Sequence, residues 1–297
     1  MQNPPERLCR IHIPDEGKSF IQVDQAGAEA LIFAYECRAG KFRSLFDYSI
    51  KPHTFVALNL FVNHWRKETP YDSIHLSGLS IPDLAGHPDW KHLGKIIKNH
   101  RQRYFIGKKT CHSGNYGKYA ASFRFDVLKE SEGKIVLNLL EAELFLSLYH
   151  GLFPEIKEEQ RDIEQQVKTT RRLVNVFGYP MYFGGQLTDK VIREALAWKS
   201  QSTVGIIASN AMRDMQNFIE SHGVDWDVLN NKHDSVLIQA PHDEATKAAK
   251  ILVGFMTPEL TSTRGEKYRM KAEASIGLNW DKYDLEKNPN GMKEVEL

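Results

Sequence analysis

The sequence predicts an α+β fold, in which a helical insertion interrupts a small antiparallel sheet. Two observations lead to this prediction. β-prone runs lie near both ends of the chain, at 20–23 and 228–239, whereas the middle is helical in pattern and basic. We find no internal repeat and no low-complexity linker in the 297 residues, a length that gives one large or two modest domains.

The first predicted strand, 20–23, ends directly at Asp24. A turn is expected before it at 13–17, and the run 28–35 after it is helix-prone. We therefore expect Asp24 at a junction between a strand and a helix.

Further along, helices are expected at 53–65 and at 135–149, where apolar residues recur at helical spacing. A loop-rich stretch is expected at 71–89, because prolines interrupt it. The run 171–182 predicts a turn between extended segments, and 189–221 predicts a long helix.

Residues 228–239 consist of two β-prone flanks around a polar centre. This pattern predicts a hairpin with Asp234 near its tip. A helix is expected at 243–256 and another strand at 268–278.

The formal net charge of +1 is almost neutral, so a surface that binds nucleic acid has to be a local basic patch. Residues 91–118 meet that requirement, since they contain Lys and Arg but no Asp or Glu. The basic residues are Lys91, Lys95, Lys98, Arg101, Arg103, Lys108, Lys109 and Lys118.

The three cysteines lack the paired spacing of a disulfide framework or a zinc ribbon, which favours a reducing compartment. The N-terminal residues lack the apolar core of a signal peptide, and no apolar run is long enough for a membrane span. We therefore expect a cytoplasmic protein without a membrane partner.

Asp24 and Asp234 are the candidate catalytic residues, because each carboxylate adjoins apolar strand residues. A carboxylate in such a place needs a partner or a metal ion. On adjacent strands the two could hold two Mg²⁺ ions, which would activate a primer 3′-hydroxyl and stabilise the departing pyrophosphate. The alternative is that both are ordinary turn or capping aspartates.

Lys108, His112 and Tyr116 are four residues apart, so on a helix they share one face. Lysine would neutralise phosphate charge, the ring of His112 could stack on an incoming base, and Tyr116 would end the helix. The alternative is a solvated basic helix face.

Six segments resemble, in the same order, motifs of the family A (polymerase I type) DNA polymerases. The match to 108–117 is closest to phage-like forms, which carry a histidine and end in Asn-Tyr-Gly. Serine replaces the glutamate of the His-Asp-Glu motif at Ser235. The segments are 23–29, 51–54, 108–117, 201–204, 232–235 and 277–280.

The resemblance implies a DNA-directed DNA polymerase, with Asp24 and Asp234 as the metal-binding carboxylates. The backbone carbonyl of Gln25 would be a further metal ligand. Glu29 would be the steric gate that rejects a 2′-hydroxyl.

It also implies that Lys108 contacts the nucleotide triphosphate, with help from His53, although Lys109 remains an alternative. His112 would stack on the nucleotide, and Tyr116 would lie at the insertion site. The position of the family's arginine is taken by Tyr104, so Arg103, one residue away, is the candidate for that contact.

Gln201 and His233 would touch DNA in the minor groove and at the primer end. The arginine-rich segment of the family is replaced here by 178–181, so phosphate contacts are expected to pass to Arg171 or Arg172.

In the domain organisation that this implies, residues 1–50 and 186–297 form a palm and 51–185 form the fingers of a right-hand polymerase. Residues 2–5 resemble the point at which the family's palm resumes after its thumb. We therefore expect a split or truncated polymerase, acting on primer-template DNA and dNTPs in a bacterial or phage-infected cytoplasm. A separate chain would supply the thumb and exonuclease.

Parts of the sequence also fit three functions other than that of a DNA polymerase. A non-catalytic nucleic-acid-binding module could keep the fold and bind single strands through its aromatic residues. The pair His233-Asp234 also resembles the HD metal phosphohydrolases, but there the pair lies on a helix, whereas here it lies among β-prone residues. An RNA polymerase or reverse transcriptase is the nearest enzymatic alternative, and Glu29 argues against it.

Overall fold

The computed structural model describes residues 6–297, and the chain divides into two compact units. We call them the sheet unit and the helical unit. The assignment of palm and fingers stays a prediction, since compactness alone defines these units. The sheet unit comprises residues 1–32, 175–177 and 200–297, and the helical unit comprises residues 33–174 and 178–199.

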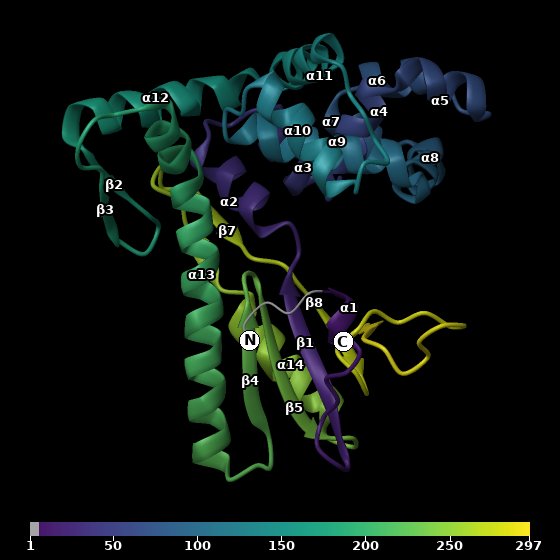
Figure 1. Cartoon of the computed structure of the whole chain (residues 1–297), viewed down its shortest axis with the longest axis vertical. Coiled ribbons are helices and arrows are strands. Elements are labelled where there is room, and N and C mark those ends of the chain that lie inside the picture. Colours follow the sequence, from purple (N-terminus) through teal and green to yellow (C-terminus); the bar gives the residue numbers. More distant parts are fainter. Residues whose placement is uncertain (1–5) are drawn as a thin grey trace. The chain divides into compact units, whose positions relative to one another are not determined.

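The sheet unit is built on a five-stranded sheet with the order β4-β5-β1-β8-β9, in which every neighbouring pair is antiparallel (Figure 1). β1 occupies the centre, so a strand from the start of the chain lies between strands from its end. This confirms the predicted α+β class. The strands are β1 Lys18–Gln25, β4 Asp227–Lys232, β5 Ser235–Pro241, β8 Ala272–Gly277 and β9 Lys293–Val295.

One face of this sheet is covered by helix α14 (Ala245–Met256) and by the second half of helix α13 (Asp189–His222). Ile21 and Val23 of β1 are fully buried in the core between the sheet and these helices. Because side chains alternate along a strand, Gln22 and Asp24 lie on the opposite face. The sheet therefore presents Asp24 away from its main core.

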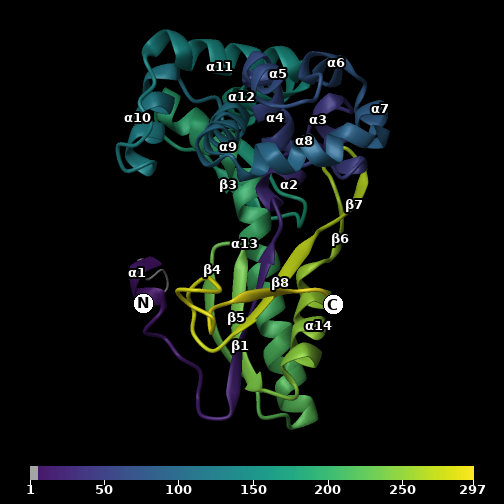
Figure 2. The ribbon, with the colours of Figure 1, turned by 90° about the vertical axis from the view of Figure 1, so that its right-hand side faces the viewer.

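Figure 2 shows the helices of the helical unit gathered together. Apolar clusters within this unit hold its elements together. Helices α4 and α9 pack especially closely, since a Cβ atom on Gly107 would lie 2.8 Å from the backbone oxygen of His53. The helices are α3 Lys41–Asp47, α4 Pro52–Leu60, α5 Val62–Glu68, α6 Ser73–Gly78, α7 Ile81–Gly86, α8 Pro88–Asn99, α9 Arg101–Asn115, α10 Ala120–Glu130, α11 Leu139–Leu152 and α12 Pro154–Thr170.

A sharp turn connects β1 to the helix that follows it. Gly27 adopts a φ of +64°, a left-handed conformation that suits glycine. The predicted strand-to-helix junction after Asp24 is thus confirmed. The remaining elements are α1 Glu6–Cys9, α2 Ala28–Glu36, β2 Arg172–Val174, β3 Pro180–Tyr182, β6 Glu259–Thr261 and β7 Lys267–Arg269.

The prediction of a loop-rich stretch at 71–89 is wrong. Helices α6 and α7 lie there, and α8 begins within it. Pro82 and Pro88 stand in the first turns of α7 and α8, where a missing N–H costs nothing because those N–H groups have no partner within the helix. The prolines therefore begin helices here. The expected single helix at 53–65 is also divided into α4 and α5.

Among the described residues, no helix is both long enough and apolar enough to cross a membrane.

Candidate active site

The two predicted catalytic aspartates lie at the same end of neighbouring strands. β1 and β5 pair so that Asp24 stands directly opposite Ser235. The backbone N–H of Gln25 donates a hydrogen bond of 3.0 Å to the backbone oxygen of Asp234. The fold therefore brings together two residues that are far apart in the sequence.

Asp234 is held in a tight hairpin. His233 and Asp234 form the turn between the last residue of β4 and the first of β5, as the pairing of Lys232 with Ser235 shows. His233 has a φ of +56°, which is unusual for a residue with a side chain. Two-residue hairpin turns require this left-handed geometry, and strained backbone of this kind clusters at functional sites. The predicted hairpin with Asp234 at its tip is confirmed.

A third carboxylate, Glu273, was missed by the sequence analysis. It lies on β8 directly opposite Asp24, and its side chain is exposed. Residues that face one another across an antiparallel pair project to the same side of the sheet, and like charges there repel. A cation at this end of the sheet would relieve that repulsion. Sequence pattern alone could not find Glu273, because only the strand register makes it a neighbour of Asp24.

Two carboxylates are a set of ligands whose chemistry suits a magnesium ion that is bound partly by substrate. Within residues 6–297, no group of three or more His, Cys, Asp or Glu side chains is placed to hold a metal ion. Mg²⁺, however, is usually bound by one or two carboxylates together with substrate phosphates and water. The side chain of Gln25 is fully buried on the helix-covered face, so this residue could contribute only its backbone.

The other predicted residues of the sheet unit occupy varied positions. Glu29 lies in the first turn of α2, a few residues after Asp24, and is half-buried. Gln201 is exposed on α13, and His233 is exposed at the hairpin tip. All three side chains are therefore at least partly accessible to a ligand.

In the helical unit, His53 of α4 lies near Lys108 and His112 of α9. Burial of the His53 ring, together with the positive charge of Lys108 and His112, lowers the pKa of His53 to about 4. His53 is therefore neutral at physiological pH, where it can form hydrogen bonds but carries no charge. Lys108 and His112 are both exposed and are on the same face of one helix, as predicted.

Two basic residues of α9 near Lys108 are already paired with carboxylates of the protein. Lys109 forms an ion pair with Glu130. Arg103 binds Glu68 through two hydrogen bonds of 2.5 and 2.7 Å, and its guanidinium lies 4.8 Å from the ring of Trp65. Of the two adjacent lysines, Lys108 is thus the better candidate for a phosphate ligand.

Tyr116 caps the C-terminal end of α9, and only 6% of it is exposed. Its ring packs edge-to-face on Phe33 at 6.0 Å and on His112 at 5.1 Å. Arg171 ends α12 in a left-handed conformation with φ +55°, and its guanidinium donates to the backbone oxygen of Gly185 at 2.9 Å.

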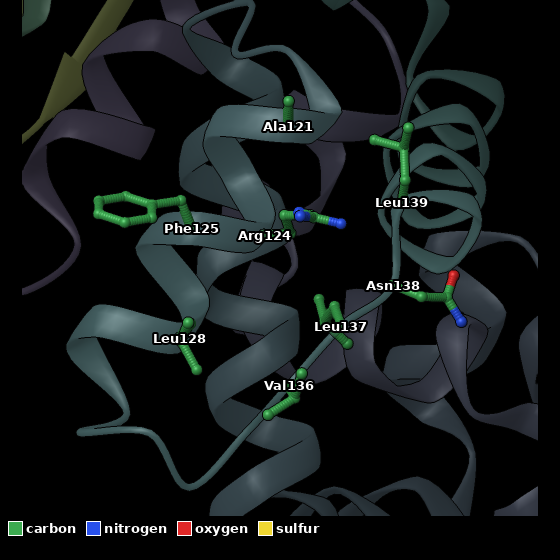
Figure 3. Close-up of a pocket in the computed structure, with 8 residues that line it drawn as sticks. All are labelled: Ala121, Arg124, Phe125, Leu128, Val136, Leu137, Asn138 and Leu139. Atoms are coloured by element: carbon green, nitrogen blue, oxygen red, sulfur yellow. The ribbon is translucent and has the colours of Figure 1, made fainter.

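Two pockets have linings that include none of the predicted site residues. One, of about 580 Å³, is lined by α10 and the segment that leads into α11, and Arg124 is the only charged residue in its lining (Figure 3). The other, of about 370 Å³, lies in the sheet unit and is lined by Gln22, Lys232 and Trp280 among others. Because Gln22 is two residues from Asp24, this second pocket opens on the same face of the sheet.

An antiparallel sheet with two aspartates at neighbouring strand ends, and a helical insertion between its strands in the sequence, is the α+β arrangement that the resemblance to polymerases predicts. The comparisons with known proteins agree with this assignment, although no protein-family model matches the chain. The chain is 18% identical over 281 residues to DNA polymerase I of Pseudomonas aeruginosa, covering 93% of the chain and 26% of that protein. It is 20% identical over 290 residues to DNA polymerase I B, chloroplastic/mitochondrial, of Arabidopsis thaliana, covering 94% of the chain and 27% of that protein.

Among solved structures, the chain is similar to the POL domain of Pol1 from M. smegmatis, in complex with a DNA primer-template and dNTP. The TM-score is 0.65 at 18% identity, and the match covers 93% of this chain and 42% of that one. This likeness shows the fold. The resemblance to the polymerase I family is thereby confirmed over nearly the whole chain, which spans about a quarter of the length of the curated relatives it matches.

Proposed function

We propose that this chain catalyses template-directed transfer of deoxynucleotides to a primer 3′-hydroxyl. The observation that carries the proposal is the adjacency of Asp24 and Asp234, fixed by the hydrogen bond from Gln25 to the Asp234 backbone. The similarity to DNA polymerase I over 93% of the chain supports it.

In the proposed reaction, the primer 3′-oxygen attacks the α-phosphorus of a deoxynucleoside triphosphate in line. A new oxygen–phosphorus bond forms, and the bond to the β-phosphate breaks as pyrophosphate leaves. Asp24 and Asp234 would hold two Mg²⁺ ions, with the Gln25 carbonyl as a further ligand. Bound there, Mg²⁺ lowers the pKa of the attacking hydroxyl and neutralises charge on the leaving pyrophosphate.

The remaining candidate residues have roles in binding. We propose that Lys108 neutralises the triphosphate, with the neutral His53 beside it as a hydrogen-bonding group. The exposed position of Lys108 and the pairing of Lys109 with Glu130 support this choice. His112 would stack on the incoming base, and Tyr116 would border the insertion site.

On the DNA side, Gln201 and His233 would contact the minor groove and the primer end. Arg171 would contact phosphates, and Glu29 would exclude a 2′-hydroxyl. The exposure of Gln201, His233 and Arg171 supports these assignments. Arg103 would take part only if it exchanged its partner Glu68 for a phosphate.

The proposal is tested by Mg²⁺-dependent extension of a primed DNA template. Asp234→Asn should lower the extension rate by at least about 10³-fold while leaving DNA affinity almost unchanged, because it removes a metal ligand and not a phosphate contact. The matched control is Asp243→Asn, at an exposed turn residue before α14, which should extend at the wild-type rate. Extension by Asp234→Asn at the wild-type rate, or no extension by the wild type, would contradict the proposal.

We also propose that a separate chain helps this one to hold the duplex. The net charge of +1 supports this, since sustained grip on DNA depends on many phosphate contacts.

A further inference from the structure

The last turn of α9 is fixed by side chains of two other helices. The motif that ends the helix is regular: the N–H of Lys118 donates to the oxygen of Ser113 at 3.0 Å, and the N–H of Gly117 donates to the oxygen of Gly114 at 3.4 Å. Gly117 has a φ of +63°, as this C-terminal motif requires. Two further contacts, made by side chains, stabilise this turn in addition to the backbone hydrogen bonds.

The first contact comes from Gln160 of α12. Its amide nitrogen donates to the backbone oxygens of Gly114 at 2.6 Å and of Asn115 at 2.8 Å. These are among the carbonyls at the end of a helix that lack a partner within it. Gln160 is only 7% exposed, so these hydrogen bonds are shielded from water.

The second contact comes from Tyr149 of α11. Its hydroxyl donates to the side-chain oxygen of Asn115 at 2.6 Å and lies 3.6 Å from the sulfur of Cys111. Asn115 is 2% exposed and Tyr149 is fully buried. A buried polar network in which every member has a partner rigidifies its surroundings and specifies one arrangement.

Tyr116 follows Asn115 directly, so whatever fixes the last turn of α9 also fixes the backbone that carries the Tyr116 ring. We propose that Gln160 is a positioning residue for Tyr116, and that it thereby controls how selectively the site accepts the incoming nucleotide. This inference rests on the proposed function. The Asn115–Tyr149 hydrogen bond acts together with Gln160, through the side chain of Asn115 where Gln160 binds its backbone oxygen.

The test compares Gln160→Met with the wild type in single-nucleotide primer extension. Methionine has a similar shape but cannot donate, so the carbonyl of Asn115 loses its side-chain partner. We expect the KM for the correct dNTP to rise about tenfold while kcat changes less than about threefold. The preference for the correct over the mismatched nucleotide should fall by a similar factor.

Gln165→Met is the matched control, because Gln165 is exposed on the same helix. It should leave KM, kcat and selectivity unchanged. Gln160→Lys keeps a donor at a similar reach, so it should recover most of the wild-type KM. A purely structural role would instead lower the fraction of active enzyme, and with it kcat, at unchanged KM and selectivity, and that result would overturn the inference.

Tyr149→Phe provides a second route to the same answer if Gln160→Met does not fold. It deletes one hydroxyl and retains the ring contact with Phe153 at 5.2 Å. We expect it to raise the same KM about threefold. Unchanged KM and selectivity in the variants that fold would overturn the inference, whereas an inactive wild type would instead overturn the proposed function.

Discussion

At the residue scale, the partners of each charged side chain decide what it can bind. Lys109 and Arg103 are paired with Glu130 and Glu68, so a phosphate would have to displace a carboxylate from either of them. Lys108 is exposed and lies beside a histidine that burial keeps neutral. Two of the basic residues in 91–118 are therefore engaged within the protein and are less available to a phosphate.

Glu29 gives a prediction about the choice of sugar. It is a half-buried carboxylate in the first turn of α2, five residues after Asp24 in the sequence. If it excludes a 2′-hydroxyl, Glu29→Ala should raise rNTP incorporation relative to dNTP by at least about tenfold, as a lost contact of ~1.4 kcal/mol would give. Parallel extension with each nucleotide type measures the ratio, and an unchanged ratio would remove Glu29 from this role.

His53 gives a prediction about pH. Its pKa is lowered to about 4 in the folded protein, against about 6.5 in an unfolded chain. Between these values the unfolded state binds more protons, so the free energy of unfolding decreases as the pH falls from about 6.5 towards 4. The contribution lost between pH 6.5 and pH 5 is up to ~2 kcal/mol.

Urea unfolding of the wild type and of His53→Gln across this range tests the prediction. Glutamine does not titrate, so the variant should show the shallower pH dependence. Parallel curves for the two proteins would contradict it. His150, whose pKa burial and Lys157 also lower to about 4, should add an effect in the same direction.

At the scale of elements, the contact between α4 and α9 fixes where Lys108 and His112 lie. Gly107 permits this contact, since an added Cβ atom would lie 2.8 Å from the His53 oxygen and 2.9 Å from the Ala57 Cβ. Gly107→Ala should therefore move α9 away from α4 and lower the free energy of unfolding by about 1–3 kcal/mol. The KM for dNTP should rise as well.

Gly254→Ala is the appropriate control for that substitution. Gly254 is also in the interior of a helix, but a Cβ atom there would meet nothing within 4 Å. Alanine should be neutral or stabilising by up to ~1 kcal/mol at this position, because it favours helix more than glycine does. Denaturant unfolding of both variants separates the effect of packing from that of helix propensity.

At the scale of the whole molecule, charge limits how long the chain can remain on DNA. With a net charge of +1, we expect this chain alone to make short products at physiological salt. Longer products should appear at low salt, since affinity for DNA falls steeply as salt rises. Product length on a primed single-stranded template, at about 50 and about 150 mM salt, measures this. Long products at the higher salt without a partner would refute it.

The sequence alone determined the elements that carry strong local patterns. The strand before Asp24, the hairpin around Asp234 and the helix α13 were predictable, because apolar periodicity and turn chemistry act over a few residues. The placement of Lys108 and His112 on one helix followed from their spacing in the same way. At 71–89 the local pattern predicts that prolines interrupt helices, whereas in the structure Pro82 and Pro88 lie in the first turns of helices.

The tertiary structure decided which distant residues meet. Strand register placed Glu273 opposite Asp24, and helix packing brought Gln160 and Tyr149 to the end of α9. Such contacts depend on how elements pair and pack, and the sequence pattern of a single element does not determine which other element it will meet. The physical reason is that hydrogen-bond register and core packing are collective, whereas periodicity and capping are local.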